Sequence, residues 1–471
     1  MKNYISIIFI IALSSITSLI NQICIAHFFG ANAELDILNI SMALPNSMMA
    51  LSVGGLNLVL IPILTATKLD GKNVRHIIVF FENKMLIWGI SSIVVLFFIQ
   101  ILFYKNRIPT EIFYKFIIIS IFSSCFLFLT LLNSIYLSWA NIEKKYVLTS
   151  FGGIFLNLTS IITCYFFHSY LGIYVLPITL ILSSFILNYF LKYSLTKRNS
   201  PQTDYWDFKF PKLGLSIGAS ILSVIPFAFP SFVDSYLLSD SLVGNVSYTA
   251  YANKLMTVLG LLIIQPLNLI LFPVFSEMIN KKDIISLSKI IENTIFFIIF
   301  ICLFVVIFVN KFFLDVINII FNHGLFKAKD AENLTELMKY YVLGLAGMAL
   351  MNILNRLFAA LSENIFQIII SISFIIVYFL IAQFFYATNG YLSVGISYFY
   401  TWTFFVMIAI IKFYTYFKHS INYVGYFLFL ICVFANYYFS TNNVILILNC
   451  CLILSTSLFF LKNIIKTQNE Q

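Results

Sequence analysis

The chain has 471 residues, of which 61% are hydrophobic and only 10% are charged. This composition excludes a water-soluble globular protein, in which about a quarter of the residues are charged, and it excludes a disordered chain, which has too few apolar residues to form a core. The net charge of +9 is no sign of nucleic-acid binding, because Lys and Arg in so apolar a chain mark the cytoplasmic loops of a membrane protein.

Long apolar runs predict an all-α polytopic membrane protein, because a spanning helix needs about 20 mostly apolar residues. The first run has about 25 apolar residues, well beyond the roughly 7–15 of a signal-peptide core, so we expect an uncleaved first helix. About fourteen transmembrane helices are expected, at residues 4–29, 35–64, 78–104, 113–139, 147–168, 170–191, 213–238, 245–276, 287–310, 335–361, 365–387, 390–411, 421–439 and 443–465.

The positive charges predict the orientation of these helices. With the N-terminus inside, 18 of the 28 Lys and Arg residues fall on the inner side, six fall on the outer side and four lie within helices. Such an excess is typical of cytoplasmic loops. We therefore expect both the N-terminus and the C-terminus to be cytoplasmic.

A repeated segment predicts that the chain consists of two parallel lobes. Residues 56–62 read Leu-Asn-Leu-Val-Leu-Ile-Pro, and residues 267–273 read Leu-Asn-Leu-Ile-Leu-Phe-Pro, 211 positions later. This offset matches the spacing of two six-helix sets, and parallel repeats with a substrate site between them are found in transporters. We expect an N-lobe of helices 1–6 over 1–192, a cytoplasmic linker over 193–212, a C-lobe of helices 7–12 over 213–414, and helices 13 and 14 with a cytoplasmic tail over 415–471.

No segment outside the predicted helices is long enough for a soluble catalytic domain, so we do not expect an enzyme. The longest outer segments cover about residues 105–115 and 311–334. The sequence has no phosphate-binding loop of the ATPase kind, so we expect an ion gradient or the membrane potential to drive transport. The seven cysteines and five histidines lack metal-ligand spacing, and we expect no metal and no cofactor.

Two basic residues inside predicted helices are candidates for binding an anionic group. Lys254 lies about ten residues into the eighth helix, and Arg356 lies late in the tenth. A charge at a helix centre costs about 2.5–3.5 kcal/mol on insertion and persists mainly where it faces a cavity or a partner. Arg would bind a diphosphate through paired hydrogen bonds and Lys as a point charge. The alternative is that both side chains extend to the membrane interface.

Polar residues near the predicted outer face are candidates for gating and for lining the substrate pathway. Asp36 at the start of the second helix and Asp234 at the end of the seventh could close a gate, bind a coupling cation or cap a helix. Asn21, Gln22 and His27, late in the first helix, could line a polar vestibule. The alternative is that each of these three side chains bonds a neighbouring helix.

Prolines predict two irregular helices. Pro226 and Pro230 predict a break in the seventh helix. Pro45, followed by Gly54 and Gly55, predicts a bend in the second helix, which is tolerated in a membrane where neighbours satisfy the freed backbone groups. Such a bend is consistent with a helix that flexes during transport and equally with a static kink.

A series of segments, in chain order, resembles the signatures of the MurJ/MviN family of lipid II flippases, within the multidrug/oligosaccharidyl-lipid/polysaccharide exporter superfamily. The resemblance covers most of the first twelve predicted helices. The matching segments are 27–36, 44–46, 61–64, 244–248, 252–256, 321–326 with Asp330, 341–345 and 354–358.

The resemblance implies a bacterial plasma-membrane flippase that works by alternating access. Its substrate would be an undecaprenyl-pyrophosphate-linked saccharide, either lipid II or an O-antigen or exopolysaccharide repeat unit. Membrane lipids and proteins of cell-wall or polysaccharide synthesis would be its other partners. Two further readings are a drug/cation antiporter of the same superfamily and a membrane scaffold that does not transport.

The chain departs from the family pattern at charged positions. Where members carry Arg-Asp in the first helix, this chain has Asn21-Gln22, and where they carry Asp-Arg in the eighth helix it has Asn253-Lys254. Lys254 and Arg356 keep a positive charge at matching places. The resemblance therefore assigns substrate binding mainly to these two cations, with Asn253 beside them.

Overall fold

The part of the chain that the structure describes is mainly helical. The computed structural model describes residues 2–70, 73–143, 145–196, 218, 221–281 and 283–417. These ranges contain no strand, and eight stretches within them are long and apolar enough to cross a membrane, judged by length and composition. The chain thus has the fold of a helical membrane protein. The predicted helices at 421–439 and 443–465 and most of the predicted linker lie outside the described residues.

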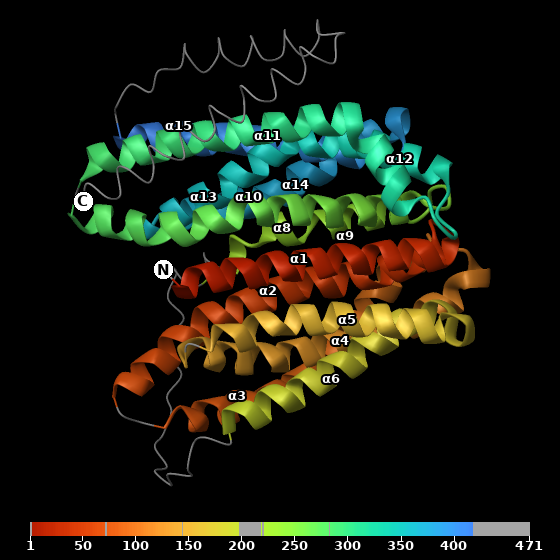
Figure 1. Cartoon of the computed structure of the whole chain (residues 1–471), viewed down its shortest axis with the longest axis horizontal. Coiled ribbons are helices and arrows are strands. Elements are labelled where there is room, and N and C mark those ends of the chain that lie inside the picture. The colour runs from red at the N-terminus through yellow and green to blue at the C-terminus, as the bar shows by residue number, and fades with distance from the viewer. Residues whose placement is uncertain are drawn as a thin grey trace, which may run out of the picture. The chain divides into compact units, whose positions relative to one another are not determined.

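The described helices cover the first six predicted spans and those from the eighth to the twelfth, and the seventh span, 213–238, is described only in part. The first half contains α1 (Lys2–Phe29), α2 (Ala33–Leu69), α3 (Val74–Tyr104), α4 (Thr110–Ile142), α5 (Tyr146–Leu171), the 3-10 turn η1 (Gly172–Tyr174) and α6 (Val175–Thr196) (Figure 1). The second half contains α8 (Ile225–Ala228), α9 (Pro230–Leu237), α10 (Asn245–Lys281), α11 (Ile284–Phe321), α12 (Ala328–Tyr341), the 3-10 turn η2 (Val342–Gly344), α13 (Leu345–Ala360), α14 (Asn364–Asn389) and α15 (Leu392–Phe417).

The chain packs as two compact units, which we call the first and the second unit. Of the described residues, the first unit comprises those within 1–255, 320–334 and 364–383, and the second comprises those within 256–319, 335–363 and 384–417. The long helices α10, α11, α12 and α14 each contribute to both units. The predicted boundary between lobes falls in the linker, mostly outside the described residues, and stays a prediction.

In the first unit, α4 is the central helix. It packs along α2, α3 and α6, while α1 packs along α5. The aromatic side chains of Tyr136 and Trp139 on α4 are buried against Ile77 of α3 and Leu191 of α6. Because these residues are apolar and fully enclosed, their burial holds the four helices together.

Neighbouring helices satisfy the backbone of α2 where Pro45 interrupts it. Proline has no N–H to donate to the Ser41 carbonyl four residues earlier. Gln100 Nε2 of α3 donates to that oxygen at 3.2 Å, and Ser123 Oγ of α4 donates to it at 3.0 Å. Pro45 therefore interrupts one hydrogen bond of α2, and the helix continues through it.

The predicted break in the seventh helix is confirmed. The segment forms the one-turn helix α8 and then α9, which starts at Pro230. The Ala228 carbonyl at the break accepts a hydrogen bond from Ser47 Oγ of α2 at 2.7 Å. The broken helix is therefore anchored to α2, and α9 carries Asp234 into the interior of the first unit, where it has no exposed surface.

The two asparagines of the repeated segment form matching contacts. In the first unit, Ser138 Oγ of α4 donates to Asn57 Oδ1 of α2 at 2.6 Å. In the second unit, Asn268 Nδ2 of α10 donates to Asn352 Oδ1 of α13 at 2.9 Å. In each case the second helix of a predicted lobe is joined to the fourth, as a parallel repeat predicts.

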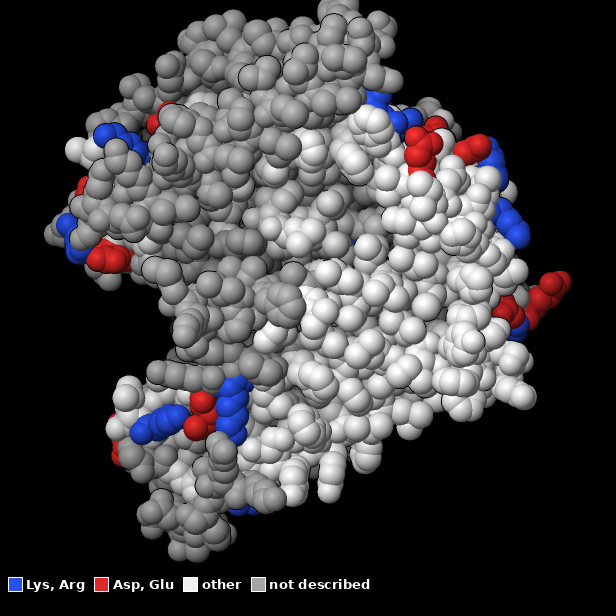
Figure 2. Space-filling model, viewed as in Figure 1, with Lys and Arg blue, Asp and Glu red and all other residues white. Residues whose placement is uncertain are grey.

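Charged side chains are distributed as in a protein that crosses a membrane. On the face drawn in Figure 2, the described Lys, Arg, Asp and Glu residues gather near the ends of the helices. The described surface between these ends carries almost only other residues. A charge-poor band between two charged rims is the surface expected in contact with hydrocarbon.

Candidate functional site

Asp36 of α2 binds the first turn of α10. Its Oδ2 accepts a hydrogen bond from Gly244 N at 2.6 Å, and its Oδ1 accepts from Ser247 N at 2.7 Å and Ser247 Oγ at 2.6 Å. A carboxylate at a helix N-terminus is stabilised by the unpaired N–H groups there. Of the predicted alternatives, the contacts are those of a helix cap, and the capped helix is α10. The start of α2 itself is capped by Asn32, whose Oδ1 accepts from Leu35 N at 2.9 Å.

Two glycines allow the end of α1 to touch the loop after α11. Leu325 N donates to the His27 carbonyl at 2.9 Å. Gly30 and Gly324 have φ values of +62° and +68°, which side-chain-bearing residues rarely adopt. A Cβ on Gly30 would lie 2.7 Å from the Leu325 carbonyl oxygen. A Cβ on Gly324 would overlap the carbonyl oxygen of His27. The close contact therefore requires glycine on both sides.

Two tyrosines of α10 complete this contact. Tyr251 Oη donates to the Gly30 carbonyl at 2.7 Å, and Tyr248 Oη donates to Asp330 Oδ1 of α12 at 2.6 Å. Asp330 Oδ2 accepts from Lys327 N at 2.8 Å, which fixes the start of α12. We call these three segments, residues 27–36, 244–251 and 324–330, the helix-end cluster.

Asp234 lies in a buried polar group with Asn253 and Tyr378. Tyr378 Oη of α14 donates to Asp234 Oδ1 at 2.7 Å, and Asn253 Nδ2 of α10 donates to Oδ2 at 3.4 Å. The structure thus brings together two predicted site residues. Sequence reasoning missed Tyr378, because it is one of 27 tyrosines and lies within an apolar helix without a motif.

Lys254 is partly exposed on α10, one turn after Tyr251. Residues three apart share a helix face, so Lys254 lies on the face whose Tyr251 reaches the end of α1. Within the described residues, no hydrogen bond or ion pair engages its ammonium group. Arg356 is partly exposed on α13 in the second unit, so the expected cooperation of the two cations stays a prediction.

The structure places the three predicted polar residues of α1 in different surroundings. Asn21 Nδ2 donates to Asn157 Oδ1 of α5 at 3.5 Å, the helix-to-helix bond given as its alternative role. Gln22 is partly buried. His27 is exposed, its ring meets the Phe28 ring edge-on with centroids 4.9 Å apart, and its carbonyl accepts the hydrogen bond that joins it to the helix-end cluster.

The described helices, with a broken helix and a buried carboxylate among them, define a helical multi-pass membrane protein. The chain belongs to the MurJ family of lipid II flippases: the sequence model described as "Lipid II flippase MurJ" matches residues 25–464. A curated relative, the "Probable lipid II flippase MurJ" of Rickettsia prowazekii (strain Madrid E), is 25% identical over 393 residues, which are 77% of this chain and 75% of the relative.

Solved structures of other proteins share the fold. "Lipid II flippase MurJ, inward closed conformation" has a TM-score of 0.75 at 18% identity, covering 98% of this chain and 100% of that one. A Vibrio cholerae MATE transporter has a TM-score of 0.64 at 13% identity, covering 89% and 97%. At these identities the likeness concerns the fold alone.

Proposed function

We propose that this chain is a flippase that moves an undecaprenyl-pyrophosphate-linked saccharide, in the first place lipid II, across the bacterial plasma membrane. The observation that carries the proposal is membership of the lipid II flippase family over residues 25–464. Transport would proceed by alternating access, without catalysis or cofactor, and would draw on an ion gradient or the membrane potential. Both termini would be cytoplasmic, and proteins of cell-wall synthesis would supply and consume the substrate.

In this proposal Lys254 binds the diphosphate. Its support is that Lys254 lies within the long helix α10, which the sequence predicts to span the membrane, and that no described residue engages its charge. A lysine so placed is expensive to insert and is retained mainly for a ligand or a cavity. Arg356 and Asn253 would add contacts to the same headgroup, and the α1 residues Asn21, Gln22 and His27 would contribute polar surface on the pathway.

The two acids have different roles in this proposal. Asp36 would hold the helix-end cluster closed, because its three hydrogen bonds must break before α2 and the start of α10 can separate. Asp234 would couple transport to an ion, because it is a fully buried carboxylate that hydroxyl and amide groups surround. In this proposal, opening of the Asp36 contact and ion binding at Asp234 together shift the chain between its inward-facing and outward-facing states.

Substitution of Lys254 tests the binding role. Lys254→Gln should reduce flipping of lipid II in proteoliposomes about ten- to hundredfold, the change expected when a hydrogen bond to a charged group worth about 1.5–3 kcal/mol is lost. Lys254→Arg keeps the charge and should preserve transport. The exposed Lys329→Gln is the matched control and should have no effect. Normal flipping by a well-expressed Lys254→Gln variant would exclude Lys254 from substrate binding.

Complementation separates this function from the antiporter reading. Expression of the chain should rescue bacteria depleted of their own lipid II flippase. If the chain instead transferred drug resistance and gave no rescue, the flippase proposal would be wrong. If the chain rescued only bacteria that lack a surface-polysaccharide flippase, the substrate would be a different lipid-linked saccharide.

A further inference from the structure

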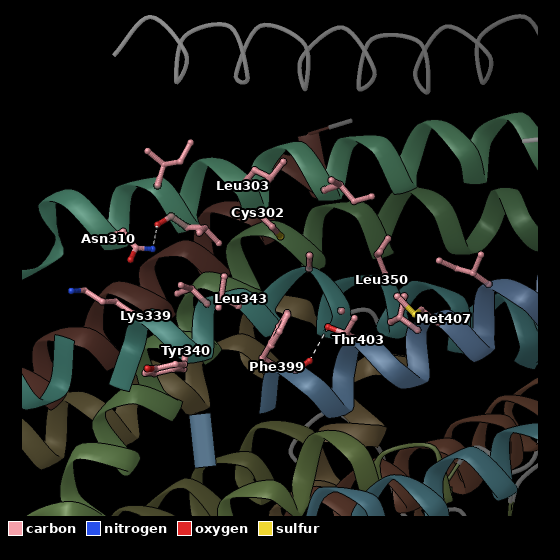
Figure 3. A pocket seen from close by; sticks show the side chains of 18 of the residues that line it. Cys302, Leu303, Asn310, Lys339, Tyr340, Leu343, Leu350, Phe399, Thr403 and Met407 are labelled. Carbon is pink, nitrogen blue, oxygen red and sulfur yellow. Dashed lines mark hydrogen bonds between the residues drawn. The ribbon is translucent and has the colours of Figure 1, made fainter. Parts of the chain in front are cut away.

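The second unit contains a cavity of about 980 Å³ that the proposed transport site does not use. It lies among α11, α12, η2, α13 and α15 (Figure 3). Most of its wall is apolar, as at Leu303, Val306, Leu343, Leu350 and Met407. A wall of this kind suits a hydrocarbon chain, because a chain that covers it buries apolar surface and breaks no polar contact.

Polar residues line the cavity at one end. Figure 3 shows Asn310, Lys339 and Tyr340 together at this end, with Leu350 and Met407 towards the other. Glu336, one turn before Lys339 on α12, also lines the cavity. The cavity therefore has a polar end, which we call its mouth, and an apolar remainder, the division found in an amphipathic lipid.

The two charges at the mouth are available to a ligand. Lys329 and Glu332, also three apart on α12, form an ion pair at 3.1 Å. Glu336 and Lys339 do not pair with each other, and no described acid pairs with Lys339. The one hydrogen bond that the structure gives Glu336 comes from Tyr391 Oη at 3.5 Å. A carboxylate and an ammonium group thus line the same end of the cavity, three residues apart on α12, without forming an ion pair.

The depth of the cavity is that of one membrane leaflet. Along α11 it extends from Ile299 to Asn310, which is about 16 Å at 1.5 Å per residue. The hydrocarbon core of a bilayer is about 30 Å thick, so the cavity covers about half of it. Lys311 directly follows Asn310 and ends the apolar span that the sequence predicts, so under that prediction the polar mouth lies at the level of the headgroups.

We infer that this cavity binds one chain of an aminophospholipid, with the lipid phosphate at Lys339 and its primary ammonium group at Glu336. Residues three apart on a helix are neighbours, so the two charges match a headgroup that carries both signs. Under the predicted topology the lipid comes from the outer leaflet. This inference does not rest on the proposed transport function, and either can fail without the other.

Native mass spectrometry of the delipidated full chain tests the headgroup. We expect one phosphatidylethanolamine to be retained more tightly than phosphatidylglycerol or diacylglycerol. Lys339→Gln and Glu336→Gln should each weaken its binding about three- to fivefold, the size expected for an exposed charge pair. Lys329→Gln, on the same helix but outside the cavity, should leave it unchanged. Equal retention of diacylglycerol would overturn the assignment of the headgroup.

A cavity-filling pair tests the location. Met407 lines the cavity and is 59% exposed, whereas Ile411, one turn along α15 and 64% exposed, does not line it. Met407→Trp should abolish retention of the lipid, and Ile411→Trp should not. Equal loss in both variants would show that the lipid binds elsewhere. Displacement of the lipid by a polyprenyl phosphate at equal concentration would assign the cavity to the transported substrate and overturn the inference.

Discussion

Gly324 and Gly30 show how much the helix-end cluster depends on single residues. Each adopts a positive φ, and each faces a backbone carbonyl of the opposite segment so closely that a methyl group does not fit. The hydrogen bond from Leu325 N to the His27 carbonyl depends on this approach. Since the cluster joins α1, α10 and α12, one added methyl group acts on three helices.

Gly324→Ala should open the contact between α1 and the loop after α11. A left-handed conformation costs a non-glycine residue about 1–2 kcal/mol, and the overlap with the His27 carbonyl adds to it. Gly390→Ala is the matched control, because Gly390 has a φ of +53° with nothing within 4 Å of the added Cβ. We expect a cysteine placed at Leu325 to react faster with a water-soluble thiol reagent in Gly324→Ala than in Gly390→Ala. Equal reaction rates would show that the loop accommodates the methyl group.

Among the elements, the matching asparagines Asn57 of α2 and Asn268 of α10 differ in whether their partner keeps another hydrogen bond when the asparagine is replaced. Ser138, the partner of Asn57, also donates to the Ser134 carbonyl at 2.9 Å. Asn352 Oδ1, the partner of Asn268, accepts a hydrogen bond that no other contact in the described part of the chain replaces. Matching positions in a repeat therefore carry unequal energetic weight.

Asn57→Leu should lower the unfolding free energy by about 0.6–1.7 kcal/mol, the range measured for hydrogen bonds between membrane helices. Asn268→Leu should lower it further, because the part-buried Asn352 Oδ1 then loses its donor. Adding Asn352→Leu to Asn268→Leu should recover part of the loss, since both polar groups are then gone. Denaturant unfolding of the purified protein in detergent measures all three. A double variant less stable than the Asn268→Leu variant would contradict this account.

The sequence predicts the elements better than it predicts their partners. Helix bounds follow from apolar runs, because the bilayer demands long apolar helices, and Pro230 marks the start of α9 directly. The partner of Asp234 could not be predicted, because Tyr378 lies 144 positions away and nothing in its local sequence selects it. Asp36 was assigned to a gate, an ion site or a cap, and only the fold shows that the capped helix is α10.

At the scale of the whole molecule, the number of helices before each loop decides which side of the membrane it faces. A reporter fused after Asn199, which lies outside the described residues, should read cytoplasmic, and one fused at Lys329 should read extracytoplasmic. The charge excess on the inner side is the reason for this expectation. Alkaline phosphatase and fluorescent-protein fusions measure the two sides. If both positions report the same side, the predicted orientation and the six-helix repeat are both wrong.

The bond between Asp36 and Ser247 has a consequence for how such a chain can arise. The two residues are 211 positions apart, the same offset as that of the repeated segment. Equivalent positions touch only at the symmetry axis that relates two copies. A homodimer of single repeats would place identical residues there, either two repelling carboxylates or two serines without an anionic cap. Under the predicted repeat, fusion of the two copies into one chain would remove that constraint, because each half could then mutate alone and an acid could face a hydroxyl across the axis.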